Sequence, residues 1–423
     1  MGVALELRGA RDRSDPMRFL ERVEAWLRDR DDEPAPHVER GTEEAILLAE
    51  LHPAAEPIRL VADERSVHLS AKTGTAGPGF HRHVCALALA LAEAFDVRWA
   101  LEDEHGDPVD ETGWLHDGDE VALEEAFLDW LGAVAAQILE LAGEGARGFA
   151  LSMPAGHVFE HDGVVATPLG PRDEGWLRAV VADPREGTDV FAWWSAGRDA
   201  AYYRGLALVA MWSEVRWRPP VTDAERALLE RVATWVERAH GLDPALELPW
   251  AEQSALLELL GEESLRATRA HVKAQARGAA ATIGYRRRPV LVQLSGGWRI
   301  TIPGELAERW EERGTWVAWD AKRSVWFTSL TVRDAEGAPS PDAESTLRSL
   351  PPLEGEEVLE LERGALKGLA AFVEEERDGE RIHRLEAHAA VDHHAAVGTL
   401  VFVDPADRDW SLTTWGSLER PAR

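Results

Sequence analysis

The chain has a single cysteine, Cys85, among its 423 residues. One cysteine cannot form an intramolecular disulfide, so a disulfide-stapled secreted scaffold is excluded and a reducing compartment is favoured. The sequence also lacks an apolar run of about 20 residues, which a membrane span requires, and its first residues lack the apolar stretch of a signal peptide. We therefore expect a cytoplasmic protein that does not bind membranes.

Basic residues are scarce. The chain has 46 Lys and Arg against 76 Asp and Glu, which gives a net charge of −30. A field of this sign repels nucleic acids and anionic membranes from most of the surface. A nucleic acid could therefore bind only at a local basic patch on this acidic surface.

The usual catalytic signatures are missing. The sequence contains no G-x-S-x-G, H-E-x-x-H, D-x-D-x-D-G, C-x-x-C or G-x-G-x-x-G motif. Cys85 lies in an apolar Ala/Leu run, where a thiolate is poorly stabilised. Carboxylates are so abundant that no general acid and base can be singled out. We assign no catalytic residue and predict no cofactor, and the absence of motifs favours a protein that is not an enzyme.

Apolar and aromatic residues are plentiful, because 45% of the chain is hydrophobic and 18 residues are Trp. This composition supports packed cores, and the length indicates two or three domains. Segments with strand-like alternation are interspersed with helical periodicity. We predict a multidomain α+β fold with mixed or antiparallel sheets and a central helical layer.

Residues 1–198 are predicted to form a mixed-sheet α+β domain. Its connections between the strand-like runs at 45–51, 57–62 and 66–71 are too short for crossover helices, so this part of the sheet should be antiparallel. Residues 199–280 carry helix-like runs separated by Pro and Gly, and we expect them to form a helical layer packed on the first domain.

Residues 281–423 are predicted to form an antiparallel-sheet α+β domain, because alternation returns from Ile283 onward. A short helix is expected at 306–312. Residues 333–355 are rich in Pro, Gly, Ser and acid without sustained periodicity, which indicates a linker or a long surface loop.

A glycine-rich loop at residues 71–79 lies between a predicted strand and a predicted helix, a position from which backbone N–H groups can hold a phosphate. The order of residues differs from a P-loop, since Lys and Thr precede the glycines, and Pro78 removes one N–H. The loop is therefore either a structural connection or the phosphate loop of a phosphate- or nucleotide-handling enzyme. Its candidate residues are Lys72, Thr73, Gly74, Gly77 and Gly79.

Histidines gather in two places, and neither has the spacing of a metal site. His81 and His83 are two residues apart on a predicted helix, so their side chains point to different faces. The second group is dense in ligand types but matches no zinc class; it comprises His383, His388, Asp392, His393 and His394. We predict no metal site.

Between Ser264 and Gly304 the chain has no acidic residue. The basic residues of this island are Arg266, Arg269, Lys273, Arg277, Arg286, Arg287, Arg288 and Arg299. The first four recur at offsets 0, 3, 7 and 11, which places them on a stripe about 80° wide on one helix. This basic ridge either binds an anionic partner such as nucleic acid, phosphate or an acidic protein, or forms an internal seam against acidic faces of the first domain.

Three tryptophans, Trp316, Trp319 and Trp326, occur in one hairpin-like region. On a strand Trp316 and Trp319 face opposite sides, so one of them is expected to be half-buried and suited to anchor an interface.

The favoured hypothesis is a non-enzymatic interaction, scaffold or regulatory protein of a bacterial multi-protein system, which binds a protein partner through its Trp-rich surface and basic ridge. The alternatives are nucleic-acid binding through the 266–299 island and phosphate chemistry at Lys72. The oligomeric state stays open.

Overall fold

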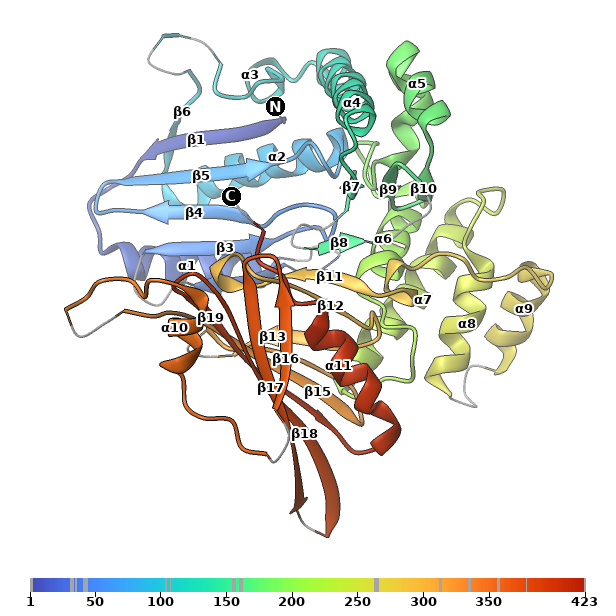
Figure 1. Ribbon diagram of the computed structural model, residues 1–423. Helices are drawn as coiled ribbons and strands as arrows, with labels where there is room; N and C mark the ends of the chain where they lie inside the picture. Colours follow the sequence, from blue (N-terminus) through green and yellow to red (C-terminus); the bar gives the residue numbers. More distant parts are fainter. Residues whose placement is uncertain are drawn as a thin grey trace. The chain divides into compact units, whose positions relative to one another are not determined.

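The computed structural model describes residues 3–30, 34, 36–40, 45–102, 105–106, 108–153, 157–159, 163–261, 266–311, 314–333, 336–355, 358–377 and 379–421. The chain divides into two compact units. Unit 1 comprises Met1–Ala155, His161–Val215 and Ala224–Gly284, and unit 2 comprises Gly156–Glu160, Arg216–Asp223 and Tyr285–Arg423. Helices and mostly antiparallel sheets make up both units, so the predicted multidomain α+β class is confirmed (Figure 1).

Unit 1 begins with an antiparallel sheet of strand order β2-β3-β4-β5-β1-β6. Its strands are β1 (Ala4–Ala10), β2 (His37–Arg40), β3 (Ile46–Glu50), β4 (Ile58–Ala62), β5 (Ser66–Lys72) and β6 (Arg98–Ala100). Side chains alternate along β1, where Leu5 and Leu7 are buried and Glu6 is exposed. Leu7 lies opposite Leu69 of β5, so the alternation and the pairing register bury the same face.

Helix α1 (Pro16–Arg28) starts at the signal that the sequence contains. The side chain of Asp15 accepts a hydrogen bond from the backbone N–H of Arg18, and Pro16 occupies the first turn. Helix α2 (Pro78–Phe95) follows the glycine-rich loop and is largely buried, and Cys85 is fully buried in it. Both helices therefore contribute buried side chains to the core of unit 1.

Helix α4 (Glu120–Gly143) is the longest of the described helices in unit 1 and follows the short helix α3 (Trp114–Asp117). Its buried face packs with helix α5 (Glu174–Ala182) in one core that includes Leu123, Phe127 and Leu177. By length and composition α4 alone among the described helices would suffice to cross a membrane: its most apolar 18 residues have a mean hydropathy of 1.3, and 28% of them are buried.

A small sheet and a helical segment complete unit 1. The sheet has the order β10-β9-β7, in which β7 pairs parallel to β9; the strands are β7 (Phe149–Ala150), β9 (Val165–Thr167) and β10 (Gly170–Arg172). A 3-10 helix, η1 (Pro184–Val190), follows α5. The helices predicted between 199 and 277 are present as α6 (Ala200–Ser213), α7 (Asp223–Leu242), α8 (Trp250–Leu260) and α9 (Arg266–Ala276).

Unit 2 contains an antiparallel sheet of strand order β13-β14-β15-β19-β18-β17-β16. Its strands are β13 (Ala307–Trp310), β14 (Trp316–Trp319), β15 (Arg323–Thr331), β16 (Val358–Arg363), β17 (Leu366–Arg377), β18 (Glu380–Val391) and β19 (His394–Phe402). Helix α11 (Arg408–Gly416) contacts β18 and β19, and its residue Trp415 approaches Gly368 of β17.

A second antiparallel sheet of unit 2 joins strands that are far apart in the sequence. Its order is β12-β11-β8, with β8 (His157–Phe159), β11 (Val290–Gln293) and β12 (Arg299–Ile302). The 3-10 turns η3 (Tyr285–Arg287), η4 (Ser295–Gly297) and η6 (Pro405–Asp407) connect elements of this unit. The chain thus contributes to unit 2 before unit 1 is complete in sequence.

The helix predicted at 306–312 is wrong where the structure describes it, because Ala307–Trp310 form strand β13. Each residue of β13 pairs with β14, from Ala307 opposite Trp319 to Trp310 opposite Trp316. A four-residue segment has little helical stability of its own, and pairing with a tryptophan-rich strand overrides its helix propensity.

Residues 333–355 include a packed element. Helix α10 (Ala343–Arg348) is capped by Asp342, whose side chain accepts the N–H of Ser345. Ala343 and Leu347 pack with Ala390 in a small core beside the sheet. Part of this acidic, Pro-rich stretch is therefore anchored to the sheet.

The two tryptophans of β14 differ in burial, as expected. Trp316 is 1% exposed, while Trp319 on the same strand is half-buried. Trp326 of β15 lies opposite Val317 and is 43% exposed. The use of this face as a partner surface stays a prediction.

Candidate functional site

A groove of about 460 Å³ runs along the outward face of α4 in unit 1. We call it the α4 groove, and its lining residues are Val3, Glu111, Thr112, Ala126, Asp129, Trp130, Ala133, Val134 and Gln137. At about 100° per residue, the six α4 positions cover one face about 140° wide. The groove floor is built from small side chains, and carboxylates stand at its rim.

Trp130 forms the main aromatic wall of the α4 groove. Its ring centroid lies 5.9 Å from that of Phe191, and its indole Nε1 is buried with no hydrogen-bond partner among the described residues. A Cβ atom at Gly74 would lie 3.2 Å from Cε2 of Trp130. The glycine-rich loop therefore supports the groove by leaving room for this ring.

Thr112 forms the opposite wall and is held by Asp110. The hydroxyl of Thr112 donates to Oδ1 of Asp110 at 2.8 Å. The backbone N–H of Thr112 donates to the same oxygen at 2.9 Å, and the N–H of Leu115 donates to Oδ2 at 2.8 Å. These bonds fix the conformation of the segment from Asp110 to Leu115, and an isolated bridge between Asp110 and Leu5 joins it to β1.

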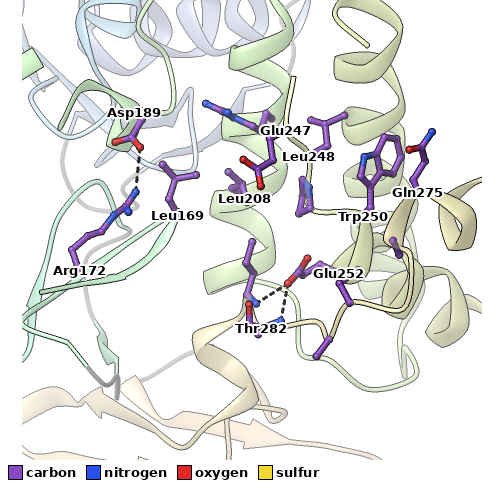
Figure 2. Close-up of a pocket in the computed structure, with 17 residues that line it drawn as sticks. Leu169, Arg172, Asp189, Leu208, Glu247, Leu248, Trp250, Glu252, Gln275 and Thr282 are labelled. Carbon is purple, nitrogen blue, oxygen red and sulfur yellow. Dashed lines mark hydrogen bonds and ion pairs between the residues drawn. The ribbon is translucent and has the colours of Figure 1, made fainter. Parts of the chain in front are cut away.

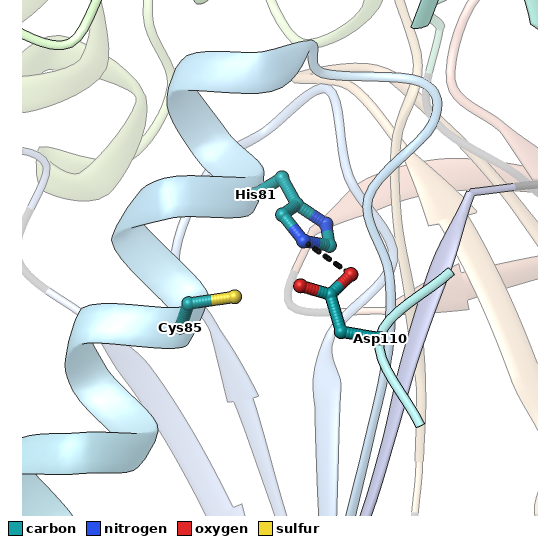
Figure 3. Close-up of side chains that lie close together, drawn as sticks. All are labelled: His81, Cys85 and Asp110. Carbon is teal, nitrogen blue, oxygen red and sulfur yellow. Dashed lines mark ion pairs between the residues drawn. The ribbon is translucent and has the colours of Figure 1, made fainter. Parts of the chain in front are cut away.

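Behind Thr112 lies a fully buried histidine, His81, on the first turn of α2 (Figure 3). Its Nε2 lies 3.0 Å from Oδ1 of Asp110, and its Nδ1 lies 2.8 Å from Oγ1 of Thr73. Burial raises the pKa of Asp110, but the hydrogen bond and charge of His81 and the backbone N–H groups outweigh burial and lower the pKa to about 2. The carboxylate is therefore ionised at neutral pH.

Cys85 stands one helical turn after His81 on the same face of α2 (Figure 3). The ligand atoms of His81, Cys85 and Asp110 lie within 4.8 Å of one another, and all three residues are buried. Burial raises the pKa of the Cys85 thiol. The four-residue spacing of His81 and Cys85 is a helical metal-pair signal that the analysis of His81 with His83 missed, whereas nothing local marks Asp110 as their neighbour.

Side chains of these three types bind Zn²⁺ in proteins, but both ring nitrogens of His81 already have hydrogen-bond partners within the protein. His81 uses Nδ1 with Thr73 and Nε2 with Asp110 and Thr112. Thr73 and Asp110 do lie on opposite ring nitrogens of His81, as the hydroxyl and the acid of a nucleophile triad do. All three side chains are buried, however, so the Thr73 hydroxyl is not exposed to a substrate. The cluster is a hydrogen-bonded support for the α4 groove wall.

The polar groups of the predicted phosphate loop have partners within the protein. Lys72 pairs with Glu56 through a distance of 3.0 Å at an exposed position. The N–H groups of Thr73 and Gly74 both donate to the carbonyl of Val3. These donors are engaged in joining β5 to β1.

The backbone N–H groups of Gly77 and Gly79, later in the loop, are also hydrogen-bonded within the protein. The N–H of Gly77 donates to the Thr73 carbonyl, and that of Gly79 donates to the carbonyl of Trp193. A Cβ at Gly79 would lie 2.3 Å from Cδ1 of Trp193, so glycine allows this segment to approach the 193–195 chain closely. The loop has the contacts of a structural connection, and the phosphate hypothesis stays untested.

A second cavity, of about 700 Å³, lies elsewhere in unit 1 and is called the Glu252 cleft (Figure 2). It lies between the β10 region, η1, α6, α8, α9 and the segment at 279–283. Its polar lining residues are Arg172, Asp189, Arg204, Glu247, Glu252, Gln275 and Thr282, and Leu169, Leu208, Leu248 and Trp250 are among its apolar ones.

Glu252 is the most buried charged residue of this cleft, with 4% exposure. Its Oε1 accepts the backbone N–H groups of Thr282 at 2.7 Å and Ile283 at 2.9 Å. On one side of the cleft Arg172 pairs with Asp189 at 3.2 Å (Figure 2). Sequence analysis had no signal for this site, because its carboxylates do not differ from the many others in the chain.

The basic ridge on α9 is only partly exposed. Arg269 donates from Nη2 to the carbonyl of Leu257 at 2.6 Å, so it ties α9 to α8. Lys273 and Arg277 are exposed and make no ion pair among the described residues. The side chain of Arg266 lies outside the described part of the structure.

The remaining basic residues of the island belong to unit 2 and are engaged there. Arg286, 3% exposed, pairs with Glu308 at 2.6 Å. The Arg287 guanidinium lies 3.5 Å from the centroid of the Trp217 ring.

Two further arginines complete the island. The exposed Arg288 donates its backbone N–H to the Tyr285 carbonyl at 3.0 Å. Arg299 lies with its Nη1 4.0 Å from Glu419. The island is therefore split between the two units, with the ridge in unit 1 and the arginine triplet in unit 2.

No protein-family description matches this chain, and no curated protein does. Among solved structures, a protein from Bacteroides thetaiotaomicron whose crystal structure was determined at 1.50 Å resolution is 7% identical, with a TM-score of 0.25. The match covers 30% of this chain and 46% of the other, so the chain spans less than half of that protein. This likeness supports no statement about function.

Proposed function

We propose that this chain is a non-enzymatic interaction protein, of scaffold or regulatory type, that binds an amphipathic segment of a partner protein in the α4 groove. The observation that carries the proposal is an apolar helix whose outward face is left uncovered. A hollow along a helix that is lined by apolar side chains and bordered by charged ones is the form of groove in which an amphipathic helix docks. The partner segment combines an apolar stripe with Lys or Arg.

The lining of the α4 groove supports this occupant. Ala126 and Ala133 leave space between the walls, and a partner's larger apolar side chains would fill it. The Trp130 ring adds an aromatic wall against which such side chains pack. A groove with a small-residue floor and an aromatic wall suits a helix laid along α4.

Charge selects the class of partner. Glu111 and Asp129 border the groove, and the chain carries a net charge of −30. In a symmetric pair of two copies these carboxylates would face each other, which disfavours self-association through this face. A cationic partner segment would instead be steered toward the rim.

Binding of a fluorescent 18-residue helical peptide, with Leu on one face and Lys on both flanks, tests the proposal by anisotropy with the full chain. We expect Ala133→Arg to weaken binding at least tenfold, because the larger cation fills the groove and repels the peptide. Ala201→Arg, at an exposed alanine of α6, is the matched control and should change nothing.

Three results would contradict the proposal. One is binding that Ala133→Arg leaves unchanged, and another is equal binding of a peptide in which Glu replaces Lys. The third is association of the chain with phospholipid vesicles that Ala133→Arg abolishes, which would make a membrane the occupant of the α4 groove.

Nucleic-acid binding is a second candidate function, since Lys273 and Arg277 are exposed on α9 without acidic partners in the described residues. Duplex DNA binding that falls steeply with salt, with a smaller salt slope after Lys273→Glu and Arg277→Glu, would support it. Absence of DNA binding at low salt would eliminate it.

A further inference from the structure

The Glu252 cleft has the features of a small-ligand site. Its volume of about 700 Å³ falls within the range of about 300–1,000 Å³ common for such pockets. Apolar side chains alternate with a few charged ones, and all of them belong to unit 1. We propose that the cleft binds a zwitterionic ligand with a cationic group at one end and a carboxylate at the other.

The cationic end is assigned to Glu252. This carboxylate is 96% buried, since its exposure is 4%, and it makes no ion pair among the described residues. Two backbone N–H groups satisfy Oε1, and Figure 2 shows the other oxygen directed away from those bonds. A buried carboxylate is costly without a cation, and a ligand ammonium or guanidinium would supply one.

Two neighbours strengthen the cationic end. Glu247 lines the same cleft and adds a second carboxylate that has no ion pair in the described structure. Trp250 adds an indole ring, and Figure 2 shows it among the lining side chains together with both glutamates. Paired carboxylates beside an aromatic ring are the groups that recognise organic cations.

The anionic end is assigned to Arg204. Arg204 lines the cleft, is half-buried, and has no acidic partner among the described residues. The other arginine of the cleft, Arg172, is already neutralised by Asp189 at 3.2 Å. Arg204 is therefore left to pair with a ligand carboxylate, for which its planar fork is suited. Free basic amino acids and the C-terminus of a peptide ending in Arg or Lys share this chemistry.

Isothermal titration calorimetry of the full chain tests the inference with L-arginine, L-lysine and the tripeptide Gly-Gly-Arg. We expect at least one of them to bind, and the one that binds identifies the source as a free amino acid or a peptide terminus. Agmatine, which lacks the carboxylate of arginine, and the C-terminal amide of the tripeptide should bind at least tenfold more weakly.

Two variants locate the ligand. Glu252→Gln keeps an oxygen that accepts both backbone N–H groups and removes only the charge, so it should weaken binding at least tenfold. Arg204→Gln, at a less buried position, should abolish the preference for L-arginine over agmatine. The matched exposed controls Glu230→Gln and Arg178→Gln should bind like the unmodified chain.

The inference is overturned if none of the three ligands gives binding heat at millimolar concentration. It is also overturned if agmatine binds as tightly as L-arginine, or if Arg204→Gln and Glu252→Gln both bind like their controls. Because α4 contributes nothing to the cleft lining, these outcomes are independent of peptide binding in the α4 groove.

Discussion

The hydroxyl of Thr73 lies 2.8 Å from Nδ1 of His81, and both side chains are fully buried. Through this contact the end of β5 is joined to the first turn of α2, and through Asp110 the same histidine reaches the loop before α3. The wall of the α4 groove is thus held by a buried polar network. Such networks are sensitive to the loss of any one member.

Asp110→Asn should reduce stability in a pH-dependent way. The folded-state pKa of Asp110 is lowered from 3.8 to about 2, so its contribution of about 2 kcal/mol is present above pH 3.8 and is lost as the pH falls through about 2. Urea unfolding at pH 7 and pH 3 measures this. The stability difference between wild type and variant should shrink at the lower pH, and a constant difference would contradict the ionised pair.

His52 should make the protein sensitive to mild acid. Burial, and then the charge of His83, lowers its pKa from 6.5 to about 3. The unfolded chain therefore binds a proton that the folded chain does not, and up to about 5 kcal/mol of stability is lost as the pH falls from 6.5 toward 3.

His52→Phe isolates this effect. At pH 7 the variant should lose about 1–3 kcal/mol, because the N–H of Ala54 no longer finds Nδ1 as its acceptor. At pH 4.5 the deficit should disappear or reverse when unfolding is followed in urea. His116→Phe, at an exposed position, should show no such crossover.

Gly205→Ala should destabilise the protein although alanine favours helices by up to about 1 kcal/mol. A Cβ at Gly205 of α6 would lie 2.3 Å from the carbonyl oxygen of Ala192. Either α6 or the backbone at Ala192 must therefore move, at a typical cost of about 1–3 kcal/mol. Gly241→Ala in α7 meets nothing within 4 Å and should raise Tm. Equal Tm changes for the two variants would refute the close packing.

Arg286→Ala should cost about 1–3 kcal/mol, because it removes the guanidinium that lies 2.6 Å from Glu308 and leaves that carboxylate with Arg216 at 4.0 Å. The double reversal Lys273→Glu and Arg277→Glu should change stability by less than about 1 kcal/mol, because both residues are exposed. Thermal melts of the two proteins compare them directly. A larger loss for the double reversal would show that the α9 residues are buried in solution.

Elements with local signals were predictable from the sequence. Helix α1 has its capping residue, Asp15, only four residues before Phe19, where its apolar spacing begins. The connections between β3, β4 and β5 are so short that these strands had to pair antiparallel. Strand β13 was missed because its conformation depends on a partner that follows it in the chain, and Ala307–Trp310 alone resemble a helix.

The candidate sites depend on contacts that no local pattern reports. Asp110 meets His81 from 29 positions away. The outward face of α4 becomes a groove only because its opposite face is buried with α5. Nothing in the sequence around Glu252 marks it out from other glutamates. Only the folded chain buries it and brings the backbone N–H groups of Thr282 and Ile283 to its carboxylate.

Strand β8 pairs with β11 so that Val158 lies opposite Leu291, 133 residues later in the chain. During synthesis at about 5–20 residues per second, β8 leaves the ribosome roughly 7–27 seconds before its partner exists. Until then β8 has no β11 strand to pair with. A nascent chain stalled before residue 290 would present the edge of β8 to chaperones or to other chains.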